Sequence, residues 1–318
     1  MVRRIVRWLD ALPHPMLACE ISPQRIAAVR WTRGGRVHEL AVEPIPPGAL
    51  AASAVEPNMA NAEVVGEAVK AVFQRLHAHD QDVALLVPDP VIRLFVQHFD
   101  EFPRSEQDAA PMLRWKLKKS VPFEAEETLV SYMRQEPRSQ GVDVVVGLAR
   151  LPIVREYEAL AEAAGLRPGV VLTSALAAMA LLEETRPALL ARVCGSSLTT
   201  AVVRAGVLCG YRCTDLPVSA DALQPAMLLE EVYPLAAYYQ DHWQEGIGAV
   251  RLGGLGARVS EFVEPVRQEL DCSVSSLVGS LERDERLGAD AEPLAEQELE
   301  GLLGWMQYRS VGEEREAA

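Results

Sequence analysis

The chain has 318 residues, of which 49% are hydrophobic, so it can bury a substantial core and form two domains or one bilobal domain. Its 45 acidic residues outnumber its 31 basic ones, and the resulting formal net charge of −14 opposes non-specific binding to nucleic acid. The five cysteines form no Cys-x-x-Cys pair and the six histidines are scattered, so neither disulfides nor a metal site is expected.

No segment is expected to span a membrane. The longest apolar run, residues 170–182, has about 13 residues, whereas a spanning helix needs roughly 20. Asp10, Pro13 and Pro15 interrupt any signal peptide that would begin at Met1. The sequence therefore predicts a cytoplasmic protein.

Residues 1–13 form an N-terminal amphipathic segment. Arg3, Arg4 and Arg7 lie beside apolar residues that include Trp8. Such a helix can rest peripherally on an anionic membrane surface, or it can pack as a frayed terminal helix on its own domain. Both interpretations stay open.

Two stretches far apart in the chain share a three-strand meander. Residues 16–42 alternate strands with polar turns, and residues 192–211 do the same around Gly-containing turns. A helix over 61–79 and strands at 83–87 and 91–99 follow the first meander. The repetition predicts a duplicated α/β fold with two similar halves.

A helix over residues 105–119 carries an unusually basic face for an acidic protein. Its cations are Arg114, Lys116, Lys118 and Lys119, and Val121-Pro122-Phe123 ends it because a residue before proline avoids the helical region. One interpretation is a solvated charged face with Phe123 in the core. The other is a docking surface for a partner.

The remaining chain alternates strands and helices. Ser174 is expected to cap an Ala-rich helix over 175–184. A glycine-rich turn, Gly253-Gly254-Leu255-Gly256, lies between a strand and the helix 259–270. Residues 283–293 read as a loop, 294–310 contain a final helix, and 311–318 form a polar tail that is expected to be disordered.

These segments, in this order, resemble the PilM-type assembly proteins of type IV pili, which are actin-like relatives of FtsA. The chain is similar, more distantly, to the cytoplasmic part of the type II secretion protein GspL. The most specific segment is MLRWKLKKSVPFEAEETLVSYM at 112–133. Other matching segments are VALLVPDPVIRLFVQHF, GVDVVVGLARLPIVREYEALAEAAGLRPGVV, AVRLGGLGARVSEFVEPVRQEL and LEGLLGWM.

The resemblance implies an actin-like, ribonuclease H-like duplicated bilobal fold. Residues 14–90 and 150–190 would form the core of the first lobe, and 91–149 an FtsA-like inserted subdomain. Residues 191–282 would form the second lobe, and the helix within 294–310 would return to the first. Only about 15 residues separate Arg212 from the helix near Met227, so the lid subdomain that closes over nucleotide in the family is expected to be absent.

The resemblance also locates a degenerate nucleotide site. Relatives that bind ATP hold its phosphates in two acidic hairpin turns and the adenosine at a glycine-rich turn. Here Pro23 removes a backbone donor from the first turn, and Val193 replaces the acid of the second. No cofactor is therefore expected, with ATP and Mg²⁺ as the alternative. The residues at these positions are Glu20, Ser22, Gly195, Ser196, Thr199, Gly253, Gly254 and Gly256.

The resemblance implies a scaffold that binds the cytoplasmic N-terminal tail of a PilN-like inner-membrane protein, in a groove between the first lobe and the inserted subdomain. Our own assignment of contact residues is Arg114, Lys116, Lys118, Val121, Pro122 and Phe123. Two alternatives remain: an actin-like ATPase whose nucleotide state switches partner affinity, and a GspL-like scaffold that recruits an ATPase.

Overall fold

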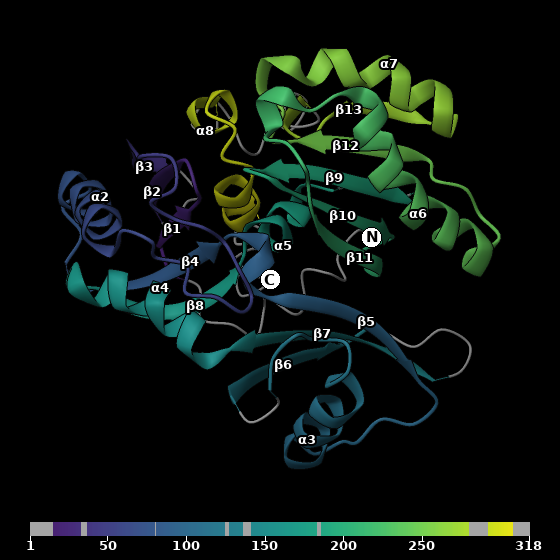
Figure 1. The fold of residues 1–318 in the computed structure, drawn as a ribbon, viewed down its shortest axis with the longest axis horizontal. Coiled ribbons are helices and arrows are strands. Elements are labelled where there is room, and N and C mark those ends of the chain that lie inside the picture. The colour runs from purple at the N-terminus through teal and green to yellow at the C-terminus, as the bar shows by residue number, and fades with distance from the viewer. Residues whose placement is uncertain are drawn as a thin grey trace.

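The computed structural model describes residues 15–32, 37–79, 81–124, 127–135, 141–182, 186–279 and 292–307. Two lobes lie side by side, and a smaller sheet with its own helix extends from one end (Figure 1). Within the described ranges, no helix combines the length and apolar character needed to cross a bilayer. The predictions for residues 1–13 and 311–318 concern residues outside this description, as does the loop predicted over 283–293 up to residue 291. Residues 292–293 are helical instead, and the single helix predicted within 294–310 is divided, because residues 297–299 interrupt it.

The first lobe is built on a five-stranded sheet with the order β3-β2-β1-β4-β8. Strands β1, β2 and β3 form an antiparallel meander, and β4 and β8 continue the sheet in parallel with β1. Helices α2 and α4 cover one face and bury it in a core of their own. The bounds are β1 Leu17–Ile21, β2 Arg25–Trp31, β3 Val37–Pro44, α2 Ala62–Arg75, β4 Asp82–Val87, α4 Leu151–Ala163 and β8 Arg167–Thr173.

The second lobe repeats this arrangement with the order β11-β10-β9-β12-β13, again three antiparallel strands followed by two parallel ones. Helices α6 and α7 cover its outer face. The duplication predicted from the two meanders is thus confirmed. Between β11 and α6 only residues 216–224 intervene, with a single 3₁₀ turn, so this interval contains no lid subdomain. The bounds are β9 Ala188–Cys194, β10 Ser197–Arg204, β11 Val207–Asp215, α6 Pro225–Trp243, β12 Ala249–Gly253, α7 Val259–Leu270 and β13 Ser273–Ser276.

The small sheet lies between β4 and α4 in the sequence, within the segment predicted to be an inserted subdomain. Its antiparallel strands have the order β5-β7-β6, and helix α3 packs on one face. Val144, Val146 and Leu148 of β7 point toward α3, and alternate residues point to the opposite face. The bounds are β5 Arg93–Phe99, α3 Glu106–Leu117, β6 Thr128–Arg134 and β7 Val142–Arg150.

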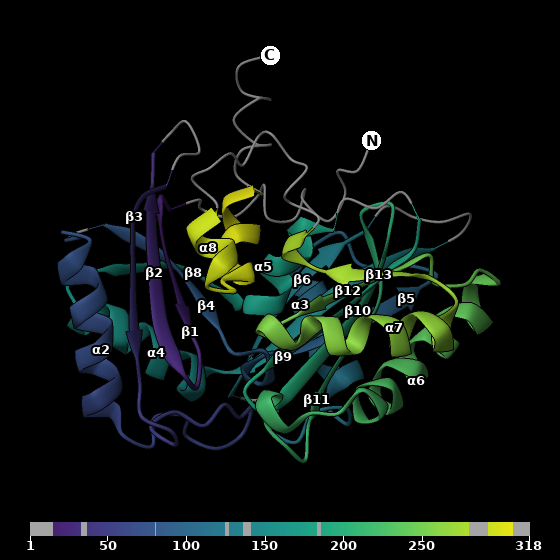
Figure 2. The same cartoon turned by 90° about the horizontal axis from the view of Figure 1, so that it is seen from above.

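The inner faces of the two large sheets share one apolar core with two short helices between them (Figure 2). One is α5, Ser174–Ala178, which continues into a 3₁₀ turn, Met179–Leu181. The other covers residues 300–307, after the short helix α8, Glu292–Glu296. Trp305 from this last segment is 1% exposed, so the end of the described chain completes the core between the lobes.

Close contact between these two helices depends on glycine. A Cβ added at Gly304 would overlap the carbonyl oxygen of Ala177, and one at Gly301 would overlap the hydroxyl of Ser174. The expected cap of α5 differs in detail, because the side chain of Thr173, rather than that of Ser174, accepts the backbone N–H of Leu176 at 3.3 Å. The Ser174 hydroxyl is therefore free for another contact.

We predict that Gly304→Ala destabilises the protein by about 1–3 kcal/mol, since the new methyl group forces the two helices apart. Gly246→Ala is the matched control, because a Cβ there meets no atom within 4 Å. Urea unfolding followed by circular dichroism measures both. Equal stability of the two variants would contradict the close packing of residues 300–307 on α5.

Candidate functional site

The two hairpin turns that correspond to the phosphate turns of ATP-binding relatives meet at the interface between the lobes. Gly195 adopts a left-handed conformation (φ 64°) at the β9–β10 turn, and a Cβ there would lie 3.1 Å from the side-chain nitrogen of Gln24 in the β1–β2 turn. Ser22 is 8% exposed, and its hydroxyl donates to the carbonyl of Arg25 at 2.9 Å within its own turn. Ser196 is exposed at the tip of its turn. The turns therefore contact each other directly.

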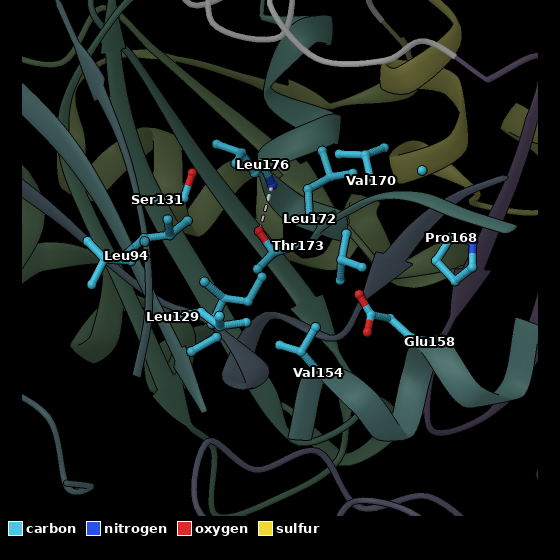
Figure 3. A pocket seen from close by; sticks show the side chains of 16 residues that line it. Leu94, Leu129, Ser131, Val154, Glu158, Pro168, Val170, Leu172, Thr173 and Leu176 are labelled. Carbon is cyan, nitrogen blue, oxygen red and sulfur yellow. Dashed lines mark hydrogen bonds between the residues drawn. The ribbon is translucent and has the colours of Figure 1, made fainter. Parts of the chain in front are cut away.

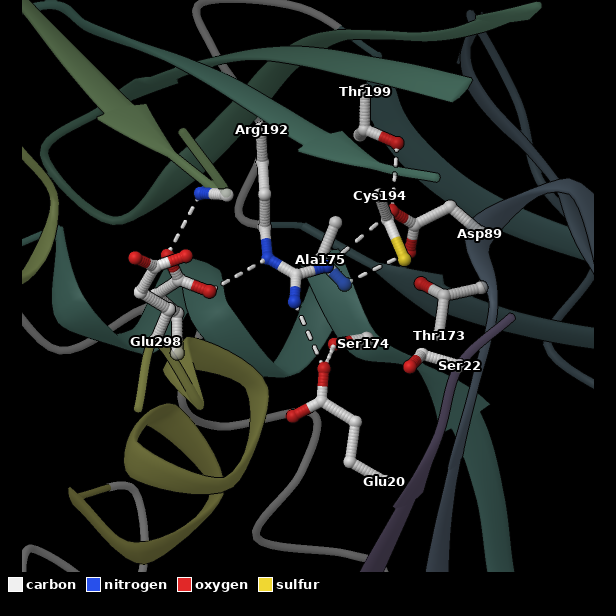
Figure 4. A network of polar contacts seen from close by, with 12 residues as sticks. Glu20, Ser22, Asp89, Thr173, Ser174, Ala175, Arg192, Cys194, Thr199 and Glu298 are labelled. Atoms are coloured by element: carbon white, nitrogen blue, oxygen red, sulfur yellow. Dashed lines mark hydrogen bonds and ion pairs between the residues drawn. The ribbon is translucent and has the colours of Figure 1, made fainter. Parts of the chain in front are cut away.

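Beside these turns, the guanidinium of Arg192 is surrounded by carboxylates (Figure 4). Its Nη2 lies 2.8 Å from Glu20 Oε1, and its Nε lies 3.3 Å from Glu300 Oε2. Its Nη1 lies 3.8 Å from Asp89 Oδ2. The four side chains are between 1% and 6% exposed, so this is a buried ionic cluster. It joins β9 of the second lobe to β1, to the turn after β4 and to the final helix.

Hydrogen bonds hold each carboxylate in place. The Ser174 hydroxyl donates to Glu20. Asp89 accepts the backbone N–H of Ala175 at 2.8 Å and the hydroxyl of Thr199 at 2.8 Å. Polar groups that are far apart in the sequence thus lie around one guanidinium. A buried charge needs such a set of opposite charges and hydrogen bonds.

The cluster contains three carboxyl groups and one guanidinium. Burial alone would lower the pKa of Arg192, but the carboxylates of Glu300 and Glu20 outweigh it and hold that pKa above its ordinary value. Burial raises the pKa of Asp89, and the nearby Arg192 opposes this rise. Arg192 therefore stays charged, and Asp89 has a pKa above that of a carboxyl group in water.

The glycine-rich turn is also occupied from within the chain. Glu300 Oε1 accepts the backbone N–H of Gly254 at 2.9 Å. A Cβ at Gly254 would overlap the carbonyl oxygen of Val193, and one at Gly253 would lie 3.2 Å from Arg192 Cγ. The carboxylate of Glu298 lies against Gly256.

These contacts do not fit ATP with Mg²⁺. The carboxylates of Glu298 and Glu300 would repel the phosphates of a nucleotide bound at the glycine-rich turn. The side chain of Arg192 lies at the point where this turn and the two hairpin turns converge. The eight predicted nucleotide-site residues are brought to one region of the interface, where the Arg192 cluster and the carboxylates of Glu298 and Glu300 occupy the space at the glycine-rich turn. A cavity of about 450 Å³ stays open beside the two hairpin turns, lined by residues that include Pro23, Gly195 and Ser196. No catalytic step follows from this arrangement.

Sequence reasoning missed Arg192, Asp89 and Glu300. Each is a charged residue inside an apolar pattern: Arg192 in ALLARVC, Asp89 after the buried strand VALLV, and Glu300 in LEGLLGWM. Buried charges are rare unless they are paired, so the three isolated charges are the signal that could have found the cluster.

A second candidate site is an apolar groove between the small sheet and the first lobe (Figure 3). It has a volume of about 290 Å³. Strand β8 forms one wall, and the face of the small sheet turned away from α3 forms the other, with α4 at one side. Glu158 is the one charged residue among the described residues that line it.

The six predicted partner residues lie on or just after α3, on the other face of the small sheet, and none lines this groove. Val121 and Phe123 pack against the core beneath α3. Arg114 donates to the carbonyl of Thr128 at 3.1 Å, and the ammonium of Lys116 lies 3.8 Å from the centroid of the Phe99 ring. Lys118 and Pro122 are exposed. Their contact with a partner stays a prediction.

No protein-family model matches this sequence, and no curated protein sequence matches it. Solved structures do match. The PilM–PilN type IV pilus biogenesis complex aligns with a TM-score of 0.68 at 17% identity over 92% of this chain and 99% of that one. A Bacteroides thetaiotaomicron protein of unknown function, described as having an actin-like ATPase fold, aligns with a TM-score of 0.51 at 11% identity, over 82% and 90%.

The cytoplasmic domain of EpsL, an inner-membrane component of the type II secretion system of Vibrio cholerae, aligns with a TM-score of 0.44 at 16% identity, over 74% of this chain and 80% of that one. The first two likenesses establish the fold of this chain. The expected actin-like, duplicated architecture and its resemblance to PilM are confirmed at the level of fold.

We predict that Arg192→Met lowers the free energy of unfolding by about 3–5 kcal/mol, because three carboxyl groups lose their buried cation. The matched control is Arg212→Met, which breaks a half-exposed ion pair with Glu231 and should cost about 0–1 kcal/mol. Denaturant unfolding compares the two. An Arg192 variant as stable as the Arg212 variant would refute the buried cluster.

The decrease in the free energy of unfolding caused by Arg192→Met should also depend on pH. The folded-state pKa of Asp89 is raised, so its contribution is fully present below its unfolded pKa and is lost as pH rises through the folded value. Removing the cation raises that pKa further. The destabilisation should therefore shrink as the pH is lowered from the alkaline side through the raised pKa of Asp89, because Asp89 then takes up a proton in the folded variant. A loss that grows toward low pH would contradict this assignment.

Proposed function

We propose that this protein is a cytoplasmic scaffold of type IV pilus assembly or of a related secretion machine. In this proposal it binds the cytoplasmic N-terminal tail of a PilN-like inner-membrane protein, and it is held at the membrane by that partner. The observation that carries the proposal is the apolar groove between the small sheet and the first lobe. The fold likeness to the PilM–PilN complex supports it.

Two sheet edges border the groove. Strand β8 is the last strand of the first large sheet, and β6 is the last strand of the small sheet. An edge strand has backbone N–H and C=O groups free to pair with an added strand. An extended peptide can therefore gain main-chain hydrogen bonds at either edge while its side chains enter the groove.

The lining suits an apolar segment. Leu129 of β6 is 41% exposed in the groove, and Leu94, Val154, Val170 and Leu172 also line it. Apolar surface left open beside free strand edges favours a partner that covers both. A short extended tail meets these two requirements, whereas a helix would leave the strand edges unpaired.

The same proposal includes no ATP hydrolysis. The region between the phosphate turns contains the Arg192 cluster, and the glycine-rich turn is bonded to Glu300. In this proposal the side chains of the Arg192 cluster and of Glu300 take the place of a nucleotide at the glycine-rich turn, so partner binding does not depend on ATP.

We predict that Leu129→Ala weakens binding of the tail by about fivefold, since a half-exposed leucine contributes about 1 kcal/mol when a peptide covers it. The probe is a synthetic peptide with the sequence of the cytoplasmic N-terminal tail of a PilN-like protein, and fluorescence anisotropy gives Kd. Leu151→Ala is the matched control, because Leu151 is 40% exposed on α4 but does not line the groove.

A third variant, Phe123→Ala, separates the groove from the surface predicted at α3. If the tail binds in the groove, Kd changes for Leu129→Ala alone. If Phe123→Ala weakens binding without lowering the melting temperature, and Leu129→Ala does not, the groove assignment is wrong and the α3 assignment is correct.

We further predict that titration calorimetry with Mg²⁺ and ATP at sub-millimolar concentration gives no heat beyond dilution. The carboxylates near the glycine-rich turn would have to be displaced before phosphates could enter. Micromolar binding, or ATP turnover that is lost in a Gly195 variant, would favour the ATPase alternative instead.

A further inference from the structure

Helix α3 exposes a large aromatic side chain. Trp115 is 72% exposed, the highest value for a large apolar side chain in the described part of the chain. Its neighbours Leu113 and Leu117, two positions away on either side, are 0% and 3% exposed against the small sheet. Two positions correspond to about 200° of helix rotation, so the indole points away from the molecule.

The end of α3 adds positive charge around this indole. Lys118 and Lys119 are exposed, and neither forms an ion pair with any residue that the structure describes. Lys116, also exposed, lies over the Phe99 ring and donates to the carbonyl of His98 at 3.5 Å. The chain has a formal net charge of −14, so a surface with unpaired lysines beside an exposed tryptophan differs in charge from the chain as a whole.

Acidic side chains lie on the same helix, but at its other end. Glu106 and Asp108 occupy the first turn. Glu106 is about 13 Å from Trp115 along the helix axis, and the Debye length is about 8 Å at physiological salt. Glu124 follows the basic stretch and is exposed, and Glu127 pairs with Arg150 at 2.9 Å. The C-terminal half of α3 therefore presents a basic and aromatic surface.

We propose that this surface, made of Trp115, Lys118 and Lys119, rests on an anionic phospholipid bilayer. Tryptophan favours the headgroup level of a membrane, and lysines near an anionic leaflet are attracted to it. Helix α3 is the outermost element on its side of the molecule, so a flat bilayer can reach it without contacting the lobes (Figure 1). The groove lies on the opposite face of the small sheet, so the two sites do not compete.

The test uses the full chain and vesicles of phosphatidylcholine with or without about 30% phosphatidylglycerol, and measures co-sedimentation. Each lysine near an anionic surface strengthens partitioning about fivefold, so a double variant, Lys118→Gln with Lys119→Gln, should bind the anionic vesicles about 25-fold more weakly. The control pair is Lys70→Gln with Arg155→Gln, which removes two exposed cations from α2 and α4.

Quenching by brominated lipids tests Trp115 itself and separates α3 from the basic segment at residues 1–13. Trp31 and Trp305 are buried, and Trp243 is half-buried at the end of α6 in the second lobe, where it stacks on Tyr239, so none of the three should be quenched. We expect quenching to be lost in Trp115→Phe and kept in Trp8→Phe. Because no peptide is involved, a failure here leaves the tail-binding proposal standing.

Three outcomes would overturn the proposal. Wild-type protein that does not sediment with anionic vesicles would show that the surface serves an acidic protein or none. A double variant within twofold of wild type would exclude Lys118 and Lys119. Quenching lost in Trp8→Phe and kept in Trp115→Phe would assign membrane contact to the N-terminal segment instead.

Discussion

The guanidinium of Arg192 lies between the two lobes, and a buried charge is tolerated only where opposite charges and hydrogen bonds surround it. Glu20, Asp89 and Glu300 supply the charge, while Ser174, Thr199 and the backbone of Ala175 and Gly254 hold the carboxylates. Because these groups come from both lobes and from the final helix, the cluster fixes the relative position of all three. A change in the angle between the lobes would have to separate the guanidinium from at least one carboxylate.

The buried cluster also limits where a ligand can bind. At the interface between the lobes, the space beside the hairpin turns and at the glycine-rich turn contains the Arg192 cluster. Two further surfaces lie at the small sheet: an apolar groove bordered by β6 and β8 on one face, and the exposed end of α3 on the other.

Much of the fold is predictable from local patterns. Strands with Gly-containing turns marked both meanders, and their repetition predicted two similar lobes, because hairpins are determined by residues that are close in sequence. The short interval after Arg212 correctly predicted the absence of a lid. The basic face of α3 was also visible. That Trp115 of this helix faces solvent was established only by the structure, since an indole at that position in the sequence could equally have been buried.

The sequence by itself predicted most of the elements and their order, though not β6 or β13, and it revealed the altered residues in the phosphate turns, notably Pro23 and Val193. Only the tertiary structure decided which side chains surround these turns. Arg192 meets Glu20 across 172 positions and Glu300 across 108, and Thr199 meets Asp89 across 110. Such contacts arise from the packing of whole lobes rather than from local periodicity. For the same reason the groove could not be predicted from the sequence, because it forms where β8 and the small sheet face each other.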